Sequence, residues 1–587
     1  MKDKRIVVKY LFPAMLLLYA LRHVAQGIDL WDGGYNYANF TYGGLQYMDA
    51  MWFFATWLAN VTGSLIVRLP FGHTMLGMNV YTGLLQGAIA LAAYLFCVRK
   101  LQLQPVIAAV GELLALSLCW APSAVLYNYM TYGLLFVGAS LLYRGLTEGR
   151  DRYLVLAGVA LGLNVGVRFP NLMQAGLILA VWYDAFLQKD SLRTVCRKTG
   201  LCVAGYAGAV LALFGMLAGI YGADAYVQGI RNLLQISDTA PDYSARFLLF
   251  SIVETYIDSV TTYWMKRLLL VAVGTIALGA GARGRWKRAA QTAAILFCAA
   301  GMGFLIYRGY CTTDYQAYSS MFYPTIFWLL AGSLLALGQL VRKETVPEKK
   351  LQAFEMLLLL YITSVGSNNA MYSCINNLFL IAPWTLDLAV RTIRNKNNER
   401  YFGARVLLAG LGIVFCVQGI GFGLYFVCEG AAGARDTDYR ITGIPVLAGM
   451  RTGAENGREL EALYGCLAER QLLRKRCILY GDIPGISYYM QLPPAMNVWS
   501  DLLSYGPERM RRDLEGVQRD LAAGQAPVVI VHTKYADARE GAEEYPPAMD
   551  PVTKEKLDVL YDFMHNNGYR RLADTQSTVF AVYVPET

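Results

Sequence analysis

The sequence predicts a polytopic α-helical membrane protein with a small α/β domain outside the membrane, and three observations support this fold class. Of the 587 residues, 56% are hydrophobic and only 16% are charged. The apolar residues come in repeated runs close to twenty residues long, the length that a helix needs to cross roughly 30 Å of hydrocarbon. After residue 427 these runs stop, and charged residues and helix formers replace them, as a soluble domain requires.

The basic residues set the expected orientation. Lys and Arg are concentrated in short connectors between the apolar runs, such as "CVRK", "ARGRWKR" and "RTIRNKNNER". Because cytoplasmic loops of membrane proteins are enriched in Lys and Arg, we expect these connectors on the cytoplasmic side of the plasma membrane. The formal net charge of +9 therefore reflects membrane topology, and nucleic acid is not expected as a partner.

Placing the basic connectors inside and the apolar runs across the membrane predicts about thirteen spanning helices. They are expected near residues 7–26, 75–97, 104–121, 130–146, 153–166, 170–187, 200–221, 267–282, 289–307, 321–340, 351–366, 374–390 and 404–427. No small-residue cleavage site follows the first run, so it is expected to remain as an anchor. An odd number of spans with the N-terminus inside places the C-terminal residues outside.

The chain is accordingly divided into a multi-span membrane domain, residues 1–427, and an extracytoplasmic α/β domain, residues 428–587. In the second, helical patterns in "ENGRELEALYGCLAERQLLRKR", "PERMRRDLEGVQRDLAAG" and "KEKLDVLYDFMHNNGY" alternate with strand patterns in "CILYGD", "PVVIVHT" and "TVFAVYV". This alternation predicts a mainly parallel sheet. The domain has no glycine-rich phosphate loop, so no catalysis is assigned to it.

The first outer loop carries the strongest functional signal. It opens with "GIDLWDGGYNYANF", which places Asp29 and Asp32 among glycines and tyrosines directly after the first span. A carboxylate at membrane depth is costly unless it is paired or used. Such an acid either caps a helix or a glycine turn, or acts as a general base whose pKa is raised by partial burial. Gly33 and Gly34 are expected to let the backbone turn without a side chain that blocks the approach.

The opening stretch resembles the start of the first outer loop in the GT-C superfamily of membrane glycosyltransferases, which carry a D-x-x-Y or D-E-x-Y element there. Protein mannosyltransferases and aminoarabinose transferases are of this kind and use a polyprenyl-phosphate-linked sugar as donor. A large first loop with interfacial helices, many spans and a C-terminal outer domain are similar as well. Where many members have a second acid beside the first, this chain has Gly33. The aligned acid is therefore Asp29 or Asp32, and Asp32 is favoured because the Gly-Gly-Tyr run follows it directly.

The resemblance implies an inverting glycosyltransferase in which Asp32 takes the proton of the acceptor and an arginine neutralises the departing phosphate. Arg168 in "NVGVRFPNL" is the first candidate, because a guanidinium fork suits a phosphate; the alternative is an arginine that snorkels to lipid headgroups. The other candidates for substrate binding are Asp29, Tyr35, Arg246, Arg308 and Asn368, with Arg231 in reserve. His23 and His73 are expected to be hydrogen-bonded structural groups.

No cofactor is required by this interpretation. A divalent cation, Mg²⁺ or Mn²⁺, shared by Asp29, Asp32 and the donor phosphate is the less favoured alternative, since nothing else in the chain completes such a site. The expected partners are the polyprenyl-phosphate-sugar donor, an extracytoplasmic glycan, lipid or protein acceptor, and membrane lipids.

Three other functions compete with glycosyl transfer. A transporter or flippase of lipid-linked sugars would place polar residues at mid-membrane and show inverted repeats, whereas the polar residues here are expected at the outer ends of spans. A scaffold would leave the acidic first loop without a purpose. A glycan polymerase or ligase would normally depend on arginines and a histidine in a large late loop, and the loop near 222–266 contains no histidine.

Overall fold

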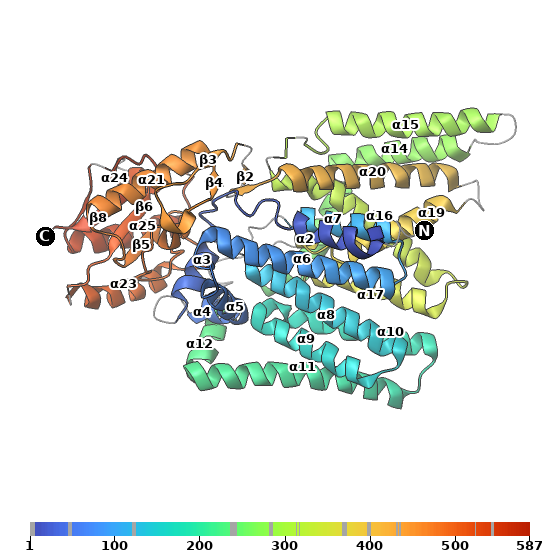
Figure 1. Ribbon diagram of the computed structural model, residues 1–587, viewed down its shortest axis with the longest axis horizontal. Helices are drawn as coiled ribbons and strands as arrows, with labels where there is room; N and C mark the ends of the chain where they lie inside the picture. The colour runs from blue at the N-terminus through green and yellow to red at the C-terminus, as the bar shows by residue number, and fades with distance from the viewer. Residues whose placement is uncertain are drawn as a thin grey trace.

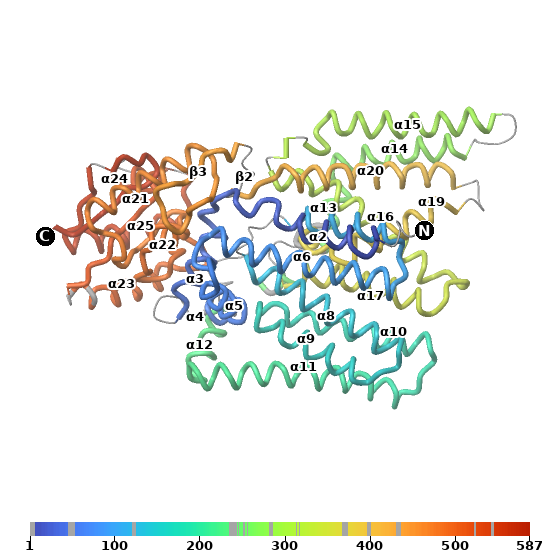
Figure 2. Tube along the Cα trace, viewed as in Figure 1, coloured from blue at the N-terminus to red at the C-terminus, as the bar shows by residue number. Residues whose placement is uncertain are grey.

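The computed structural model has a long helical part and a C-terminal part of helices and strands, which lie at opposite ends of the molecule (Figure 1). The C-terminus lies at the far end of the second part, and helix α3 (Asp32–Tyr42) lies where the two parts meet (Figure 2). The structure describes residues 6–44, 50–119, 125–234, 244–280, 286–312, 314–315, 317–366, 372–395, 401–429, 432–433, 436–522, 524–541, 545–546, 548–573 and 575–586.

Helices lie at the positions of all the predicted spans. Six stretches are long and apolar enough to cross a membrane: α6 (Met75–Arg99), α11 (Leu192–Tyr221), α14 (Tyr263–Ala280), α15 (Lys287–Tyr307), Tyr318–Val341, which contains η6 (Tyr318–Met321) and α16 (Phe322–Val341), and α20 (Phe402–Tyr425). The remaining positions hold η1 (Val7–Leu11) with α2 (Phe12–Tyr19), α7 (Pro105–Leu118), α8 (Leu126–Glu148), α9 (Asp151–Val167), η2 (Phe169–Ile178) with α10 (Leu179–Gln188), α17 (Pro347–Ile362) and α19 (Ile381–Arg394). The chain is thus an integral membrane protein, and the count of thirteen crossings stays a prediction.

Several of the loops between these helices contain helices of their own. The first outer loop contains α3, α4 (Ala50–Ala55) and α5 (Trp57–Val67), where interfacial helices were expected. The later loops contain α12 (Ala223–Leu234), α13 (Ala245–Thr261) and α18 (Tyr372–Asn376). The expected turn at Gly33 and Gly34 is wrong, because both residues belong to the first turn of α3.

Close helix packing orders the region that carries Arg168. A Cβ atom at Gly158 of α9 would overlap the backbone carbonyl of Cys202 on α11, and one at Gly205 of α11 would overlap that of Val155. Small residues of this kind let helix backbones approach closely where lipid offers no hydrophobic driving force. Helix α9, which ends one residue before Arg168, is therefore packed closely against α11.

Glu112 and Glu355 are acidic side chains buried near the middle of their helices, whereas polar groups were expected at the outer ends of spans. Glu112 of α7 is buried, and its Oε1 accepts the N–H of Leu380 at the start of α19 at 3.2 Å. It satisfies a backbone group that a helix start leaves without an intrahelical partner. Glu355 of α17 is also buried, and neither of its carboxyl oxygens has a hydrogen-bond partner in the part of the chain that the structure describes.

The C-terminal part contains a four-stranded sheet in the order β5-β6-β8-β7. The strands are β5 (Cys477–Tyr480), β6 (Val528–His532), β7 (Tyr569–Arg571) and β8 (Phe580–Pro585). The helices are α21 (Ala454–Glu469), α22 (Gly485–Tyr489), α23 (Pro507–Ala522), α24 (Thr533–Glu540) and α25 (Pro551–Asn566). Short pairs β1 (Cys428–Glu429) with β2 (Ala432–Gly433), and β3 (Tyr439–Arg440) with β4 (Arg451–Thr452), and the single turn η8 (Pro445–Leu447) precede them.

The expectation of a mainly parallel sheet is wrong. Only β5 and β6 pair in parallel, joined by a crossover that contains α23, while β6–β8 and β7–β8 are antiparallel. The connection from β7 to β8 is short, and a short connection joins antiparallel strands, whereas a parallel pair needs a long crossover. Helix patterns in the sequence could not reveal this hairpin.

The two parts share a hydrophobic core at α3. Tyr37 and Phe40 of α3 are buried in one cluster with C-terminal residues such as Ile486 and Tyr489. The Tyr37 ring also stacks on Tyr488 with ring centroids 4.9 Å apart. The helix that begins at Asp32 is therefore held by the C-terminal part.

Candidate functional site

Asp29 caps the helix that begins with Asp32. Its Oδ2 accepts the N–H of Gly33 at 2.6 Å, and its Oδ1 accepts the N–H of Trp31 at 3.2 Å. The first N–H groups of a helix lack intrahelical partners, so a carboxylate here accepts their hydrogen bonds. Its negative charge also interacts favourably with the positive end of the helix dipole. Asp29 is 3% exposed. The capping interpretation considered for the two acids thus describes Asp29.

Residues of the C-terminal part form hydrogen bonds to the backbone of Asp29 and Leu30, just before α3. The N–H of Gly485 donates to the carbonyl of Leu30 at 2.9 Å, and the Tyr489 hydroxyl donates to the carbonyl of Asp29 at 2.5 Å. A Cβ atom at Gly34 would overlap the Cα of Gly485. Gly34 is therefore needed for the close approach of α3 and α22.

Asp32 is enclosed but chemically available. Its side chain is partly exposed, and its carboxylate makes no hydrogen bond to any of the described residues. Burial and, to a smaller extent, the nearby charge of Asp29 raise the pKa of Asp32 to about 7, although the Arg168 guanidinium opposes this shift. A carboxyl group with these properties exchanges a proton near neutral pH.

Arg168 lies at the junction of α9 and η2. Its guanidinium lies 5.9 Å from the centroid of the Tyr127 ring and forms no ion pair within 4 Å of any described acidic side chain. It is nevertheless close enough to lower the pKa of Asp32. The charges of Asp32 and Arg168 therefore interact electrostatically, although the two side chains form no ion pair.

A buried amide network fixes the backbone around Arg168. The Nδ2 of Asn171 donates to Thr131 Oγ1 at 2.8 Å and to the carbonyl of Asn164 at 2.9 Å, and the Nδ2 of Asn164 donates to Gln174 Oε1 at 2.7 Å. The N–H of Asn171 also donates to the carbonyl of Arg168 at 2.9 Å. Fully satisfied buried networks of this kind are rigid, so the arginine is held in place at its backbone.

Residues of the C-terminal part reach the site at Tyr35. The Tyr35 ring contacts Trp499 with centroids 5.4 Å apart, and the Trp499 Nε1 is buried without a hydrogen-bond partner among the described residues. Burial raises the pKa of Tyr35, while the positive charge of Arg509 on α23 opposes this shift. Sequence reasoning missed Trp499 and Arg509, since no motif or spacing relates them to the first outer loop.

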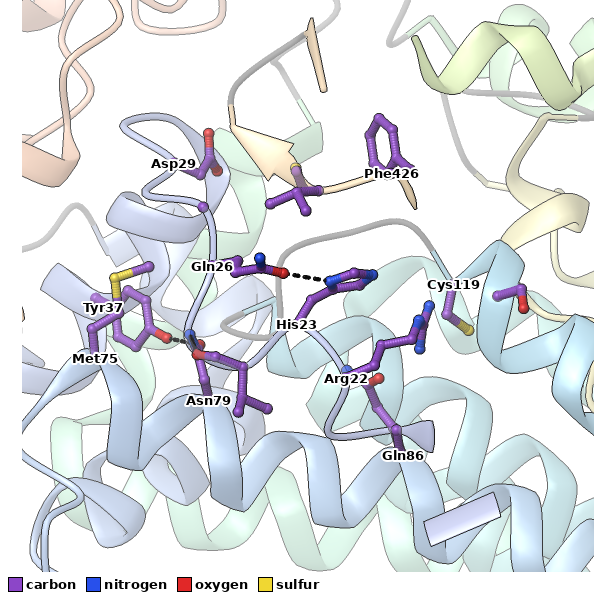
Figure 3. A pocket seen from close by; sticks show the side chains of 16 residues that line it. Arg22, His23, Gln26, Asp29, Tyr37, Met75, Asn79, Gln86, Cys119 and Phe426 are labelled. Carbon is purple, nitrogen blue, oxygen red and sulfur yellow. Dashed lines mark hydrogen bonds between the residues drawn. The ribbon is translucent and has the colours of Figure 1, made fainter. Parts of the chain in front are cut away.

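A polar cavity of about 80 Å³ lies beside Asp29 (Figure 3). Its lining includes His23, Gln26, Asp29, Tyr37 and Asn79, but not Asp32. A cavity of this size holds several water molecules. His23 bonds Gln26 Oε1 at 2.7 Å through Nδ1 and the Gly423 carbonyl at 3.1 Å through Nε2, which agrees with the structural role predicted for this histidine.

The remaining sequence candidates lie elsewhere. Arg231 on α12, Arg246 on α13 and Arg308 after α15 are exposed, and no described contact joins them to Asp32 or Arg168. Asn368 lies outside the described residues. His73 is exposed, and its backbone carbonyl accepts the Tyr488 hydroxyl at 2.9 Å. The structure thus brings together Asp29, Asp32, Tyr35 and Arg168, whose roles stay predictions.

No group of three or more His, Cys, Asp or Glu side chains in the described ranges is placed to hold a metal ion. Both carboxyl oxygens of Asp29 already accept backbone N–H groups. A cation shared by Asp29 and Asp32 would have to draw its other ligands from the donor phosphate and water, and it stays a hypothesis.

The apolar helices thus make the chain an integral membrane protein. Asp32 and Arg168, which form no ion pair with each other or with other described side chains, are its candidate functional site. No protein-family model matches the chain, and no curated protein matches it. The chain is similar to the archaeal oligosaccharyltransferase AglB from Archaeoglobus fulgidus, solved with an inhibitory peptide and a dolichol-phosphate, at 13% identity over 99% of this chain and 75% of that chain, with a TM-score of 0.43.

Two further solved structures are similar at comparable sequence identity. ArnT from Cupriavidus metallidurans, bound to undecaprenyl phosphate, matches at 12% identity over 97% of each chain, with a TM-score of 0.41. The arabinosyltransferase EmbB from Mycobacterium smegmatis matches at 13% identity over 71% of this chain and 42% of that chain, with a TM-score of 0.32. All three are GT-C superfamily glycosyltransferases.

Proposed function

We propose that the protein is a membrane glycosyltransferase that moves a sugar from a polyprenyl-phosphate-linked donor to an extracytoplasmic glycan, lipid or protein acceptor. One observation supports this most strongly: Asp32 and Arg168 lie within electrostatic range, yet neither is neutralised by the other. Transfer from a lipid phosphate needs a base for the acceptor and a cation for the departing phosphate in the same place.

The proposed reaction is a single displacement. The acceptor hydroxyl gives its proton to the Asp32 carboxylate while its oxygen attacks the anomeric carbon. The bond between that carbon and the phosphate oxygen breaks, and its electron pair leaves with the polyprenyl phosphate, whose added charge Arg168 stabilises. Attack and departure on opposite faces invert the configuration at the anomeric carbon. A base with a pKa near 7 combines a large ionised fraction with useful basicity at neutral pH.

The position of Asp32 suits a donor anchored in lipid. The apolar helices lie on one side of α3, and the C-terminal part lies on the other (Figure 1). The lipid of the donor is proposed to lie along the helices, and the acceptor to approach over Tyr35 and Trp499. The aromatic faces of Tyr35 and Trp499 offer stacking to a sugar. In this proposal residues 428–587 lie outside the plasma membrane.

The test is transfer by the purified protein in lipid nanodiscs. A radiolabelled polyprenyl-phosphate sugar is supplied with membrane-derived acceptor, and both label transfer and release of polyprenyl phosphate are measured. Stoichiometric transfer and release are expected, and a folded Asp32→Asn protein is the matched negative control. The same donor in sealed vesicles tests movement across the bilayer. Movement without transfer would replace this proposal with the transporter alternative, and neither transfer nor movement with any lipid-linked donor would favour a scaffold.

A further inference from the structure

A groove of about 860 Å³ runs between α15 and α20, with Ile393 of α19 at its edge. Its lining residues recur every three or four positions along α15, from Lys287 to Ile306, and along α20, from Phe402 to Val414. Each helix therefore presents one continuous stripe to the groove. Both helices are long and apolar enough to cross a membrane, so the groove opens into the hydrocarbon region.

The chemistry of the groove changes along its length. Lys287, Gln291 and Arg405 lie at one end, and the rest of the lining is almost entirely apolar. The Nη1 of Arg405 donates to the carbonyl of Asn395 at 2.5 Å, while its Nε is buried without a hydrogen-bond partner in the described ranges. Both helices begin at this end, so the positive ends of their dipoles add to the two cationic side chains.

This cationic end lies far from Asp32. Helix α20 has 24 residues and so spans roughly 36 Å. It begins beside Arg405, and just beyond its other end Phe426 and Cys428 line the cavity that contains Asp29. The two ends of α20 thus lie at opposite faces of the membrane, and Figure 1 shows α15 and α20 extending away from the C-terminal part. A phosphate bound at Lys287 and Arg405 would be in the leaflet opposite to the reaction centre.

We propose that this groove binds an anionic glycerophospholipid, with its phosphate at Lys287 and Arg405 and an acyl chain along the apolar stripes. Two cations at one end of an apolar channel match a negatively charged headgroup at the end of a hydrocarbon chain. The polyprenyl phosphate of the donor is a poorer match, since its phosphate has to reach Arg168 at the other face. Gly303 leaves room for the chain, because a Cβ atom there would meet no atom within 4 Å.

The site can be tested by lipid retention, which does not depend on the proposed transfer activity. Purified protein is equilibrated in mixed micelles with equal amounts of phosphatidylglycerol and phosphatidylcholine, and the lipids that remain bound are measured by native mass spectrometry. One phosphatidylglycerol is expected to be retained in preference to phosphatidylcholine. The double variant Lys287→Ala/Arg405→Ala should reduce its retention about tenfold or more, since two charge-assisted contacts are lost.

Gly303→Phe tests the chain site without changing charge, because it fills the groove at a helical position with open space; it should also displace the lipid. Gly215→Phe on α11 is its control, since a Cβ there also meets no atom within 4 Å. Arg342→Ala/Lys343→Ala is the charge control. These exposed residues follow α16, which runs antiparallel to α20, as the contacts of Tyr318 with Phe422 and of Trp328 with Phe415 show. They therefore lie at the same membrane face.

Three results would overturn the proposal. Unchanged retention in both groove variants would show that the lipid binds elsewhere. Equal retention of phosphatidylcholine would remove the role of the cations. Displacement of phosphatidylglycerol by an equal amount of undecaprenyl phosphate would assign the groove to the lipid of the donor.

Discussion

Two carboxyl groups, one in each part of the molecule, have similar electrostatics. Asp32 lies at the start of α3, and Asp501 lies in the C-terminal part. Burial is the main cause that raises both pKa values, and a second acid raises each further: Asp29 beside Asp32, and Asp482 beside Asp501. A cation opposes each shift, Arg168 in the first case and Lys556 in the second. The raised pKa alone does not distinguish them.

Their hydrogen bonds do distinguish them. Asp501 Oδ2 accepts the N–H of Asp482 at 2.8 Å, and the fully buried Lys556 donates to the carbonyls of Ser500 at 3.0 Å and Leu502 at 2.8 Å. The hydrogen-bonding capacity of this pair is thus used inside the fold. Asp32 and Arg168 have no comparable partners among the described residues. Perturbed pKa values occur in structural and functional clusters alike, so unused hydrogen-bonding capacity is the better sign of a substrate site.

The largest effect is expected from removing the basicity of Asp32. Asp32→Asn keeps the shape of the side chain but cannot take a proton, so transfer should fall about a hundredfold or more while membrane insertion stays intact. Asp501→Asn keeps an acceptor for the Asp482 N–H, so transfer per folded molecule should stay within about threefold of wild type. Initial rates and size-exclusion profiles of the two variants test this. Equal loss of transfer in both folded variants would contradict the assignment of Asp32 as the base and of Asp501 as a structural acid.

The next effect concerns the cation. Arg168→Ala should cost about 1.5 to 3 kcal/mol of transition-state stabilisation, or roughly ten- to a hundredfold in rate, and Arg168→Lys should cost less because it keeps the charge. Arg168 lowers the pKa of Asp32, so the alanine variant should also move the acidic limb of the rate profile to higher pH. Arg246→Ala and Arg308→Ala are exposed controls and should change neither. A normal rate in Arg168→Ala with loss in either control would move the phosphate role to that arginine.

The sequence predicted the positions of the helices well, because a run of about twenty apolar residues can satisfy its backbone in hydrocarbon only as a helix. Asp29 and Asp32 stood out for a related reason: acids next to an apolar run need a partner or a use. Which of the two acids caps α3 could not be predicted. It depends on which carboxylate reaches the N–H groups of Trp31 and Gly33, and this is set by how the preceding loop is bent.

The contribution of the C-terminal part could not be predicted because the contacts are not local. Tyr489 and Asp29, which it bonds, are 460 residues apart in the sequence. Gly34 looked like a turn residue because two adjacent glycines usually mark one, and its contact with Gly485 appears only in three dimensions. The proximity of Trp499 and Arg509 to Tyr35 could not be predicted either, because an aromatic and a basic residue outside any motif give no indication of what they contact.

A smaller effect is expected from loosening the contact between the two parts. Gly34→Ala places a methyl group against Gly485 and should destabilise the docking of α22 on α3 by about 1 to 3 kcal/mol. Transfer should fall because α3 carries Asp32, while the pH profile keeps its shape. Gly465→Ala on α21, where a Cβ meets no atom within 4 Å, is the matched control and should be neutral or stabilising. Limited proteolysis and thermal unfolding report the docking, and identical behaviour of the two variants would contradict it.

The smallest effect on rate, and the most informative in sign, is expected for Asp29→Asn. The amide keeps one acceptor for the N–H groups of Trp31 and Gly33, so the start of α3 should persist, at a cost of about 1 kcal/mol. Removing the charge takes away the repulsion that raises the pKa of Asp32, so the acidic limb of kcat/KM should move to lower pH, opposite to the shift in Arg168→Ala.

At pH 8, where Asp32 is ionised in both proteins, the rate of Asp29→Asn should stay within about threefold of wild type, because the base itself is unchanged. Profiles of kcat/KM between pH 5.5 and 8.5 measure the shift, with Asp482→Asn as a control that leaves the limb in place, since Asp482 acts on Asp501 and not on Asp32. A metal shared by Asp29 and Asp32 would give a different pattern. Asp29→Asn would then be as inactive as Asp32→Asn at every pH, and chelation followed by added Mn²⁺ would abolish and restore the wild-type rate. The shift of the acidic limb in Asp29→Asn therefore distinguishes two roles of Asp29: raising the pKa of Asp32 through its charge, or binding a cation.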